Sequence, residues 1–93
     1  MKLPIHYPST HFTVRKQARN EYVAIQDGKC WHCNSLIGKS PPKKIRDMKI
    51  NKSLFPSGFF EYPIHLHHNH HSGMTIGAVH AACNAVLWQY YGE

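Results

Sequence analysis

Histidine and cysteine side chains crowd into one stretch of this 93-residue chain, between positions 65 and 84. Five of the nine histidines fall within residues 65–71. Imidazole, thiolate and amide oxygen are all metal-binding groups. A Cys-x-x-Cys pair upstream and a His-x-x-Cys pair within the stretch together supply four ligands for a zinc ion, namely Cys30, Cys33, His80 and Cys83. A second group, with a different chemical task, remains: His67, His68, His70 and Asn84.

Length and composition set the frame for these two groups. A chain of 93 residues with 42% hydrophobic and 17% charged residues is expected to form one globular domain over 1–93. The apolar core of so small a domain is thin, so a metal ion is an expected supplement. Three cysteines cannot all pair as disulfides, which favours metal ligation in a reducing cytoplasm. The chain has no apolar run of membrane-spanning length, so no membrane association is expected.

Positive charge predicts a polyanionic partner. Eleven Lys and Arg against five Asp and Glu give a net charge of +6, and nucleic acid is the commonest polyanion. Six cations gather within residues 39–52 and are the predicted nucleic-acid-binding residues: Lys39, Lys43, Lys44, Arg46, Lys49 and Lys52. A merely solvated loop is the alternative. A smaller basic face at Arg15, Lys16 and Arg19 leaves open whether it is solvated or contacts phosphate.

The hydrophobic pattern predicts the helices and strands that carry these metal-binding groups. Apolar side chains recur every three or four positions and so share one helical face, at Val14, Ala18, Tyr22 and Ile25. Thr10 or Thr13 could cap this helix, and Asp27-Gly28 ends it. The rest of the pattern predicts an extended arm over 1–12, a loop over 34–53, strands over 59–66 and 74–76, and a helix from 78 to 90 or 91. The aromatic residues of the last helix are interpreted as core filler: Trp88, Tyr90 and Tyr91.

Strand, loop, strand and helix, with paired histidines on the first strand and a polar ligand on the helix, form a known catalytic arrangement. The ordered motif elements are Cys30/Cys33, His67-His68-Asn69-His70, Ser72-Gly73, Gly77, His80-x-x-Cys83 and Asn84. In these the sequence resembles the HNH, or ββα-metal (His-Me finger), endonucleases, and most of all the zinc-containing recombination endonuclease VII type. The resemblance covers about residues 22–91. It implies an α+β fold, in which zinc staples an N-terminal helix and a zinc knuckle to a ββα-metal motif over 62–91.

The chain departs from that family at two ligand positions. The second zinc pair is His80 and Cys83 where the family usually has two cysteines, a change that zinc accepts. His67 stands where the endonuclease VII type has an aspartate, and in this the chain resembles colicin-type members with a His-His dyad. Neutral ligands leave the charge of the ion less compensated and suit transition metals at least as well as Mg²⁺.

The resemblance implies roles for individual residues. His67 and Asn84 would hold one catalytic divalent ion, either Mg²⁺ or Mn²⁺ or another transition metal, apart from the structural Zn²⁺. His68 would be the general base, because its ordinary pKa lies near neutral pH. Asn69 or a main-chain group would orient the His68 ring, and His70 would bind the scissile phosphate or assist the metal. His65 and His71 are expected to face solvent or lie beside phosphate.

The expected function is therefore metal-dependent hydrolysis or nicking of duplex or branched DNA. Stand-alone domains of this kind resemble those of bacteriophage genomes, which implies a phage-encoded protein that acts in the bacterial cytoplasm as a monomer or a homodimer. The first alternative is a non-catalytic, zinc-dependent nucleic-acid-binding module whose histidines only contact phosphates. A second alternative is a metal-binding partner protein that contacts no nucleic acid.

Overall fold

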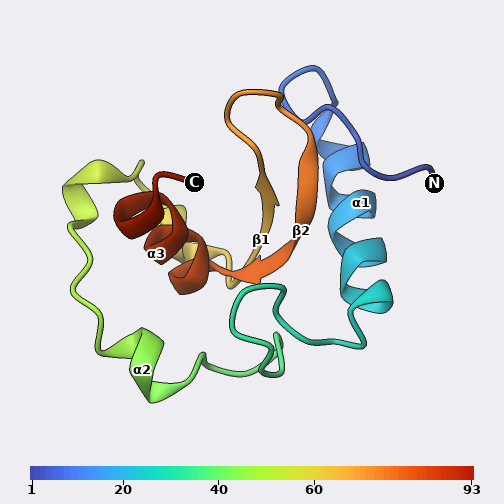
Figure 1. Cartoon of the computed structure of the whole chain (residues 1–93). Coiled ribbons are helices and arrows are strands. Elements are labelled where there is room, and N and C mark those ends of the chain that lie inside the picture. Colours follow the sequence, from blue (N-terminus) through green and yellow to red (C-terminus); the bar gives the residue numbers. More distant parts are fainter.

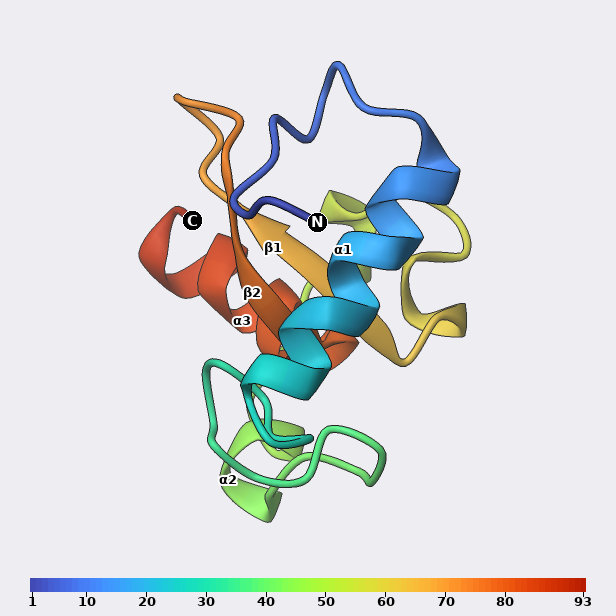
Figure 2. The ribbon, with the colours of Figure 1, turned by 90° about the vertical axis from the view of Figure 1, so that its right-hand side faces the viewer.

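A two-stranded antiparallel hairpin lies between two helices in the computed structural model, which describes all residues 1–93. The elements are α1 (Phe12–Ile25), α2 (Lys43–Arg46), β1 (Ile64–His68), β2 (Thr75–His80) and α3 (Ala81–Tyr91), with short 3₁₀ turns at Lys52–Leu54 and Phe59–Glu61. Helix α1 crosses one face of the hairpin and α3 packs against the other (Figures 1 and 2). The predicted α+β class is confirmed in this form, a hairpin followed directly by a helix. No helix is long and apolar enough to cross a membrane.

An irregularity in the hairpin falls between the two histidines of the dyad. Ile64 pairs with His80 and His67 with Gly77, but His68 pairs with Thr75. The second strand therefore carries one extra residue, which is a β-bulge and bends the strand locally. The pleat and the bulge together send consecutive side chains to different neighbours, since His67 packs against Trp31 whereas His68 packs against Tyr7.

The outer edge of β2 is covered by other parts of the chain. The Gln26 side-chain amide donates to the Ala78 carbonyl and accepts from the Ala78 N–H, each at 2.9 Å. Farther along, the Thr75 N–H donates to the Ile5 carbonyl at 3.0 Å and the Tyr7 N–H to the Gly73 carbonyl at 2.7 Å. The arm over 1–12 is therefore docked along the hairpin, because unpaired strand edges otherwise expose backbone polar groups.

Several predicted boundaries were wrong. The first strand begins at Ile64, not at 59, because residues 59–61 form a 3₁₀ turn after left-handed Gly58. The second strand continues through Gly77 to His80, so α3 begins at 81 and not at 78. Backbone pairing with β1 extends through Ala78 to His80 and overrides the helical spacing of this segment.

Helix α1 also differs from its prediction at both ends. His11, not a threonine, caps its start by accepting from the Thr13 N–H. Ala18 and Tyr22 are buried as predicted, but Ile25 is 68% exposed. The helix ends there, and left-handed Asp27 and Gly28 turn the chain toward the knuckle.

The segment over 34–53 is not wholly irregular. It contains α2, which begins directly after Pro42 and is anchored by the buried side chain of Ile45. A proline is compatible with a helix start because the N–H it lacks would have no intrahelical partner there. Gln89 and Tyr90 of α3 both donate to the Lys49 carbonyl, at 3.0 and 2.6 Å, and tie the segment to the last helix.

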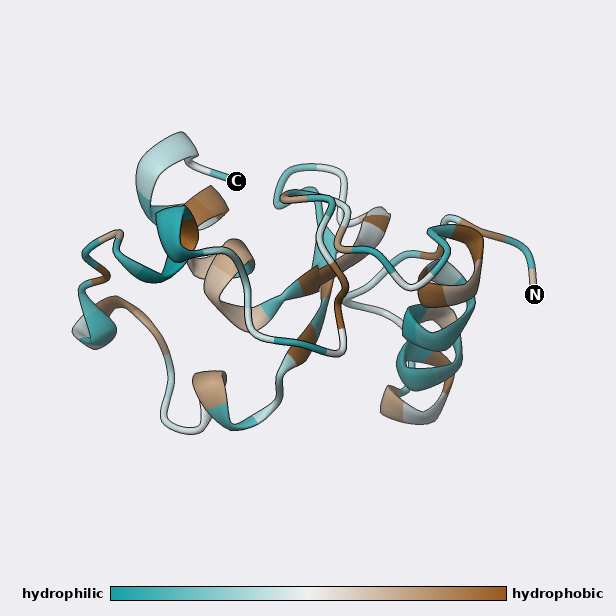
Figure 3. Ribbon diagram, turned by 90° about the horizontal axis from the view of Figure 1, so that it is seen from below, coloured by the Kyte–Doolittle hydropathy of each residue, from teal (hydrophilic) through white to brown (hydrophobic).

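The core is small and lies mostly where α1, the hairpin and α3 meet. Its most fully enclosed members are Ala18, Ala78, Val79, Cys83 and Val86. Figure 3 shows apolar residues gathered on the hairpin and a hydrophilic middle of α1. Trp88, Tyr90 and Tyr91 are 40%, 47% and 62% exposed, so their interpretation as core filler was wrong. They lie at the surface, where Trp88 contacts Phe55, Tyr90 donates to the Lys49 carbonyl and Tyr91 lies beside His32.

We expect Gly77→Ala to lower the free energy of unfolding by about 1–3 kcal/mol, as overpacking does. A Cβ at Gly77 would lie 2.8 Å from Gln26 Oε1 and 3.0 Å from the Trp31 indole, so both must shift. Gly38→Ala is the matched control, because a Cβ there would meet nothing within 4 Å and its φ is not positive. Urea unfolding measures both. Equal stability of the two variants would contradict the packing of Trp31 over Gly77.

Candidate functional site

The four predicted zinc ligands converge at the junction of the knuckle, β2 and α3. The ligand atoms of Cys30, Cys33, His80 and Cys83 all lie within 4.8 Å of one another. His80 Nδ1 is 3.4 Å from Cys33 Sγ and 3.7 Å from Cys83 Sγ. A tetrahedral zinc with Zn–S of about 2.3 Å and Zn–N of about 2.0 Å requires N···S edges of roughly 3.6 Å. This Cys₃His group could therefore hold a structural zinc ion.

Main-chain contacts fix the tautomer of His80. Its Nε2 lies 2.8 Å from the Lys39 carbonyl and 3.1 Å from the Leu36 carbonyl. A carbonyl only accepts hydrogen bonds, so Nε2 carries the proton. The lone pair of Nδ1 is then free to bind a metal ion. Lys39 thus supports the candidate metal site through its backbone carbonyl, independently of its side chain.

The thiols are electrostatically coupled. The pKa of Cys30 is lowered to about 4, first by a hydrogen bond from the Cys83 thiol and, against burial, by backbone N–H groups of Cys33, His80 and His32. The same contact with Cys30, together with burial and nearby thiolate charge, raises the pKa of Cys83. Both thiols can ionise together only if a cation lies between them, which is the condition that zinc meets.

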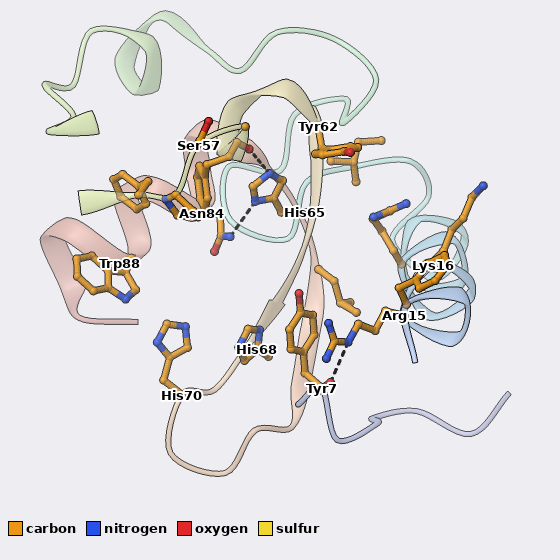
Figure 4. Close-up of a pocket in the computed structure, with 18 of the residues that line it drawn as sticks. Tyr7, Arg15, Lys16, Ser57, Tyr62, His65, His68, His70, Asn84 and Trp88 are labelled. Carbon is orange, nitrogen blue, oxygen red and sulfur yellow. Dashed lines mark hydrogen bonds between the residues drawn. The ribbon is translucent and has the colours of Figure 1, made fainter. Parts of the chain in front are cut away.

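His65 holds Asn84, although it was expected to face solvent or phosphate. Its Nε2 lies 2.8 Å from the Phe59 carbonyl, so this nitrogen is the donor and Nδ1 accepts. Asn84 Nδ2 donates to that Nδ1 at 3.1 Å. The amide oxygen of Asn84 consequently points away from His65 and has no hydrogen-bond donor from the protein (Figure 4). Burial lowers the pKa of His65, which keeps its ring neutral and able to accept.

His67 is the most enclosed histidine of the cluster. It is 1% exposed, and neither ring nitrogen has a hydrogen-bond partner. The Trp31 ring lies 5.3 Å from it, centroid to centroid. Burial lowers the pKa of His67, opposed by the charge of Glu93 and by the nearby Asn84 amide. A buried imidazole with two unpaired nitrogens is costly, so a ligand for it is expected.

His68 stands in a stack of aromatic and cationic groups. Its ring is parallel to that of Tyr7, at 4.0 Å and 6°, and the Arg15 guanidinium lies 4.0 Å from the centroid of the Tyr7 ring. Arg15 Nε also donates to the Tyr7 carbonyl at 2.9 Å, which fixes the stack to α1. Burial and then the charge of His70 lower the pKa of His68, so the ring is neutral near pH 7.

The two nitrogens of His68 differ in access. Nδ1 is buried without a hydrogen-bond partner, while Nε2 is not among the buried atoms and the side chain lines a cleft. Nε2 is therefore the nitrogen that a water or a substrate can reach.

His70 is exposed, and its ring lies 4.9 Å from that of His68. Asn69 has a different place, because its side-chain oxygen accepts from the His71 and Ser72 N–H groups and shapes the hairpin turn.

The cleft lies between α1 and the segment that precedes β1 (Figure 4). Its volume is about 740 Å³, within the usual size range of ligand sites. His65, His68, His70 and Asn84 line it, and His67 does not. Of the six cations predicted to contact nucleic acid, none lines this cleft, and Lys43 is paired with Asp47 on α2.

Four residues that shape the site were outside the predicted catalytic and metal-binding set, namely Tyr7, Arg15, Trp31 and His65. For Arg15 and His65 the sequence suggested only phosphate contact or exposure to solvent. Tyr7 and Trp31 lie in segments without periodicity, and their contacts depend on long-range packing. His65 carried one usable signal, since alternation along the strand places it on the same face as His67.

We expect removal of the metal to unfold the chain. Binding energies of structural zinc are of order 10 kcal/mol, comparable to the whole stability of a small domain. Circular dichroism should show loss of helix when a chelator is added and recovery with one equivalent of Zn²⁺. A Cys33→Ser variant should bind zinc more weakly, with Asn34→Gly as the control in the same turn, because glycine accepts the left-handed backbone of Asn34. An apo chain that melts at the temperature of the zinc-loaded chain would contradict the staple.

Comparisons of the chain with protein-family models, with curated proteins and with solved structures find no match. The case for a function therefore depends on the motif and on the geometry described above.

Proposed function

We propose that this chain is a metal-dependent DNA endonuclease of the ββα-metal class, with zinc in a separate structural site. The observation that supports this most is the set of groups around the bulge. A neutral His68 with an accessible Nε2 is adjacent in sequence to His67, a buried histidine without partners, and Asn84 offers a free amide oxygen near His67. Metal-dependent hydrolysis of a phosphodiester needs a general base and metal-binding groups beside a site that admits the substrate.

In this proposal the metal-binding pair is His67 and Asn84. The orphaned nitrogens of His67 and the free oxygen of Asn84 fit a divalent ion, because both are neutral donors that bind transition metals and Mg²⁺. Such an ion, when bound, stabilises the charge that develops on the phosphate and on the leaving oxygen.

His68 takes the proton from the attacking water at Nε2. Its lowered pKa keeps the ring neutral at neutral pH, and the tautomer with its proton on Nδ1 leaves Nε2 free to accept. The stack with Tyr7 restrains the ring. His70, exposed and 4.9 Å from His68 between ring centroids, contacts the phosphate. His65 is a positioning residue, because it acts on the metal only through Asn84.

The second candidate is the zinc-dependent nucleic-acid-binding module without catalysis. One observation favours it: His67 is 1% exposed and covered by Trp31, so a metal reaches it only from the Asn84 side. Both candidates predict DNA binding, and only the first predicts cleavage.

We expect the zinc-loaded protein to nick supercoiled plasmid with Mg²⁺ or Mn²⁺, and His68→Ala to reduce the rate by about 10²-fold or more. His71→Ala is the matched control, since His71 is an exposed histidine of the turn that follows β1 and is absent from the cleft. Gel electrophoresis of nicked and closed plasmid gives the rates. If the wild type and both variants leave the plasmid closed while the wild type still retards DNA, the binding module replaces the endonuclease.

We expect His65→Gln to weaken Mn²⁺ binding by about 10–100-fold, as loss of an outer-shell partner does. Glutamine reaches toward the Phe59 carbonyl but leaves Asn84 without its acceptor, whereas His65→Asn retains an oxygen where Nδ1 stands. Electron paramagnetic resonance of free Mn²⁺ measures the affinity without any turnover, and zinc content monitors the fold. Equal affinity of the two variants would show that Asn84 needs no support from His65.

A further inference from the structure

The two walls of the cleft differ in chemistry. On α1, Arg15, Lys16 and Arg19 line it, and no acidic side chain lines it anywhere. The opposite wall is aromatic, and in it the Phe55 ring contacts both Phe59 and Trp88. The floor between them holds His65, Leu66 and His68 of β1. Figure 4 shows Arg15 and Lys16 on one side of His68 and Trp88 on the other.

The basic wall has no acidic partner within the chain. Arg15 donates only to main-chain carbonyls, and neither Lys16 nor Arg19 forms an ion pair. Uncompensated cations that converge on one cleft attract a polyanion, and low-dielectric walls strengthen the attraction.

Phosphate binding alone does not explain the exposed aromatic side chains of the cleft. Trp88 on this wall, Tyr62 beside β1 and Phe12 at the start of α1 are 40%, 67% and 69% exposed, although all three line the cleft. A stacked duplex presents phosphates and groove edges but no free base faces, so it would leave these rings uncovered. Aromatic side chains beside a cationic groove are the arrangement by which proteins bind single strands, with bases stacked on the rings.

We propose that the cleft binds a DNA strand with unpaired bases, its phosphates along the basic wall of α1 and its bases against the aromatic wall. This rests on the proposed endonuclease function, because it brings a phosphodiester to His68. It also separates the binding surface from the basic run over 39–52, whose six cations all lie outside the cleft.

Fluorescence anisotropy of a labelled 20-nucleotide strand tests the proposal, with zinc-loaded protein and no other divalent ion, so that cleavage plays no part. Lys16→Glu/Arg19→Glu reverses two charges of the basic wall. Lys44→Glu/Arg46→Glu reverses two unpaired, exposed charges of α2 and is the matched control. We expect the first pair to weaken binding at least tenfold more than the second, and to lower the salt slope by about 1.4.

Equal losses for the two double variants would overturn the cleft as the binding surface, and so would a larger loss for the α2 pair.

A duplex of the same sequence should bind at least tenfold more weakly than the strand. Trp88→Ala should erase most of that difference while Trp88→Phe retains it, with melting curves to verify that both variants fold. A duplex that binds as tightly as the strand would overturn the role of unpaired bases. Absence of plasmid nicking would contradict only the endonuclease.

Discussion

One Cys₃His cluster that could hold a metal ion brings together parts of the chain that are far apart in the sequence. Cys30 and Cys33 belong to the knuckle after α1, His80 ends β2, and Cys83 lies in the first turn of α3. Only 18 of 93 residues are buried, so apolar burial alone gives this domain little reserve of stability. A zinc ion at this junction would fix the direction in which α3 leaves the hairpin, and with it the position of Asn84 one residue beyond the last ligand.

The junction also determines what surrounds the histidines. Trp31, between the knuckle cysteines, packs over His67 and over Gly77 on the opposite strand. On the other face, the N-terminal arm brings Tyr7 onto His68, and Arg15 of α1 covers Tyr7. Because side chains alternate along a strand, adjacent His67 and His68 enter two different environments, one closed and suited to a ligand, the other open to the cleft. The bulge in β2 lies beside this pair.

The Cys₃His group and the order of the elements were predictable, because their sequence signals are local. Pairs of ligands separated by two intervening residues predicted the Cys₃His group, and the order of strand, turn, strand and helix followed from turn residues and spacing. The beginning of α3 was misplaced because Ala78 to His80 suit a helix by composition and are held in a strand by pairing with β1. The contacts of His65, Tyr7 and Arg15 were beyond prediction, since they join residues that only the folded chain brings together.

Two ions with separate tasks are the central claim, and a crystal grown with zinc and soaked in Mn²⁺ tests it most directly. Anomalous scattering above and below the zinc edge distinguishes the two metals. We predict zinc within the Cys₃His group and manganese between the His67 ring and the amide oxygen of Asn84. Manganese bound elsewhere, or a His67 whose nitrogens stay without a ligand at saturating Mn²⁺, would contradict the account and leave a zinc-stapled basic domain.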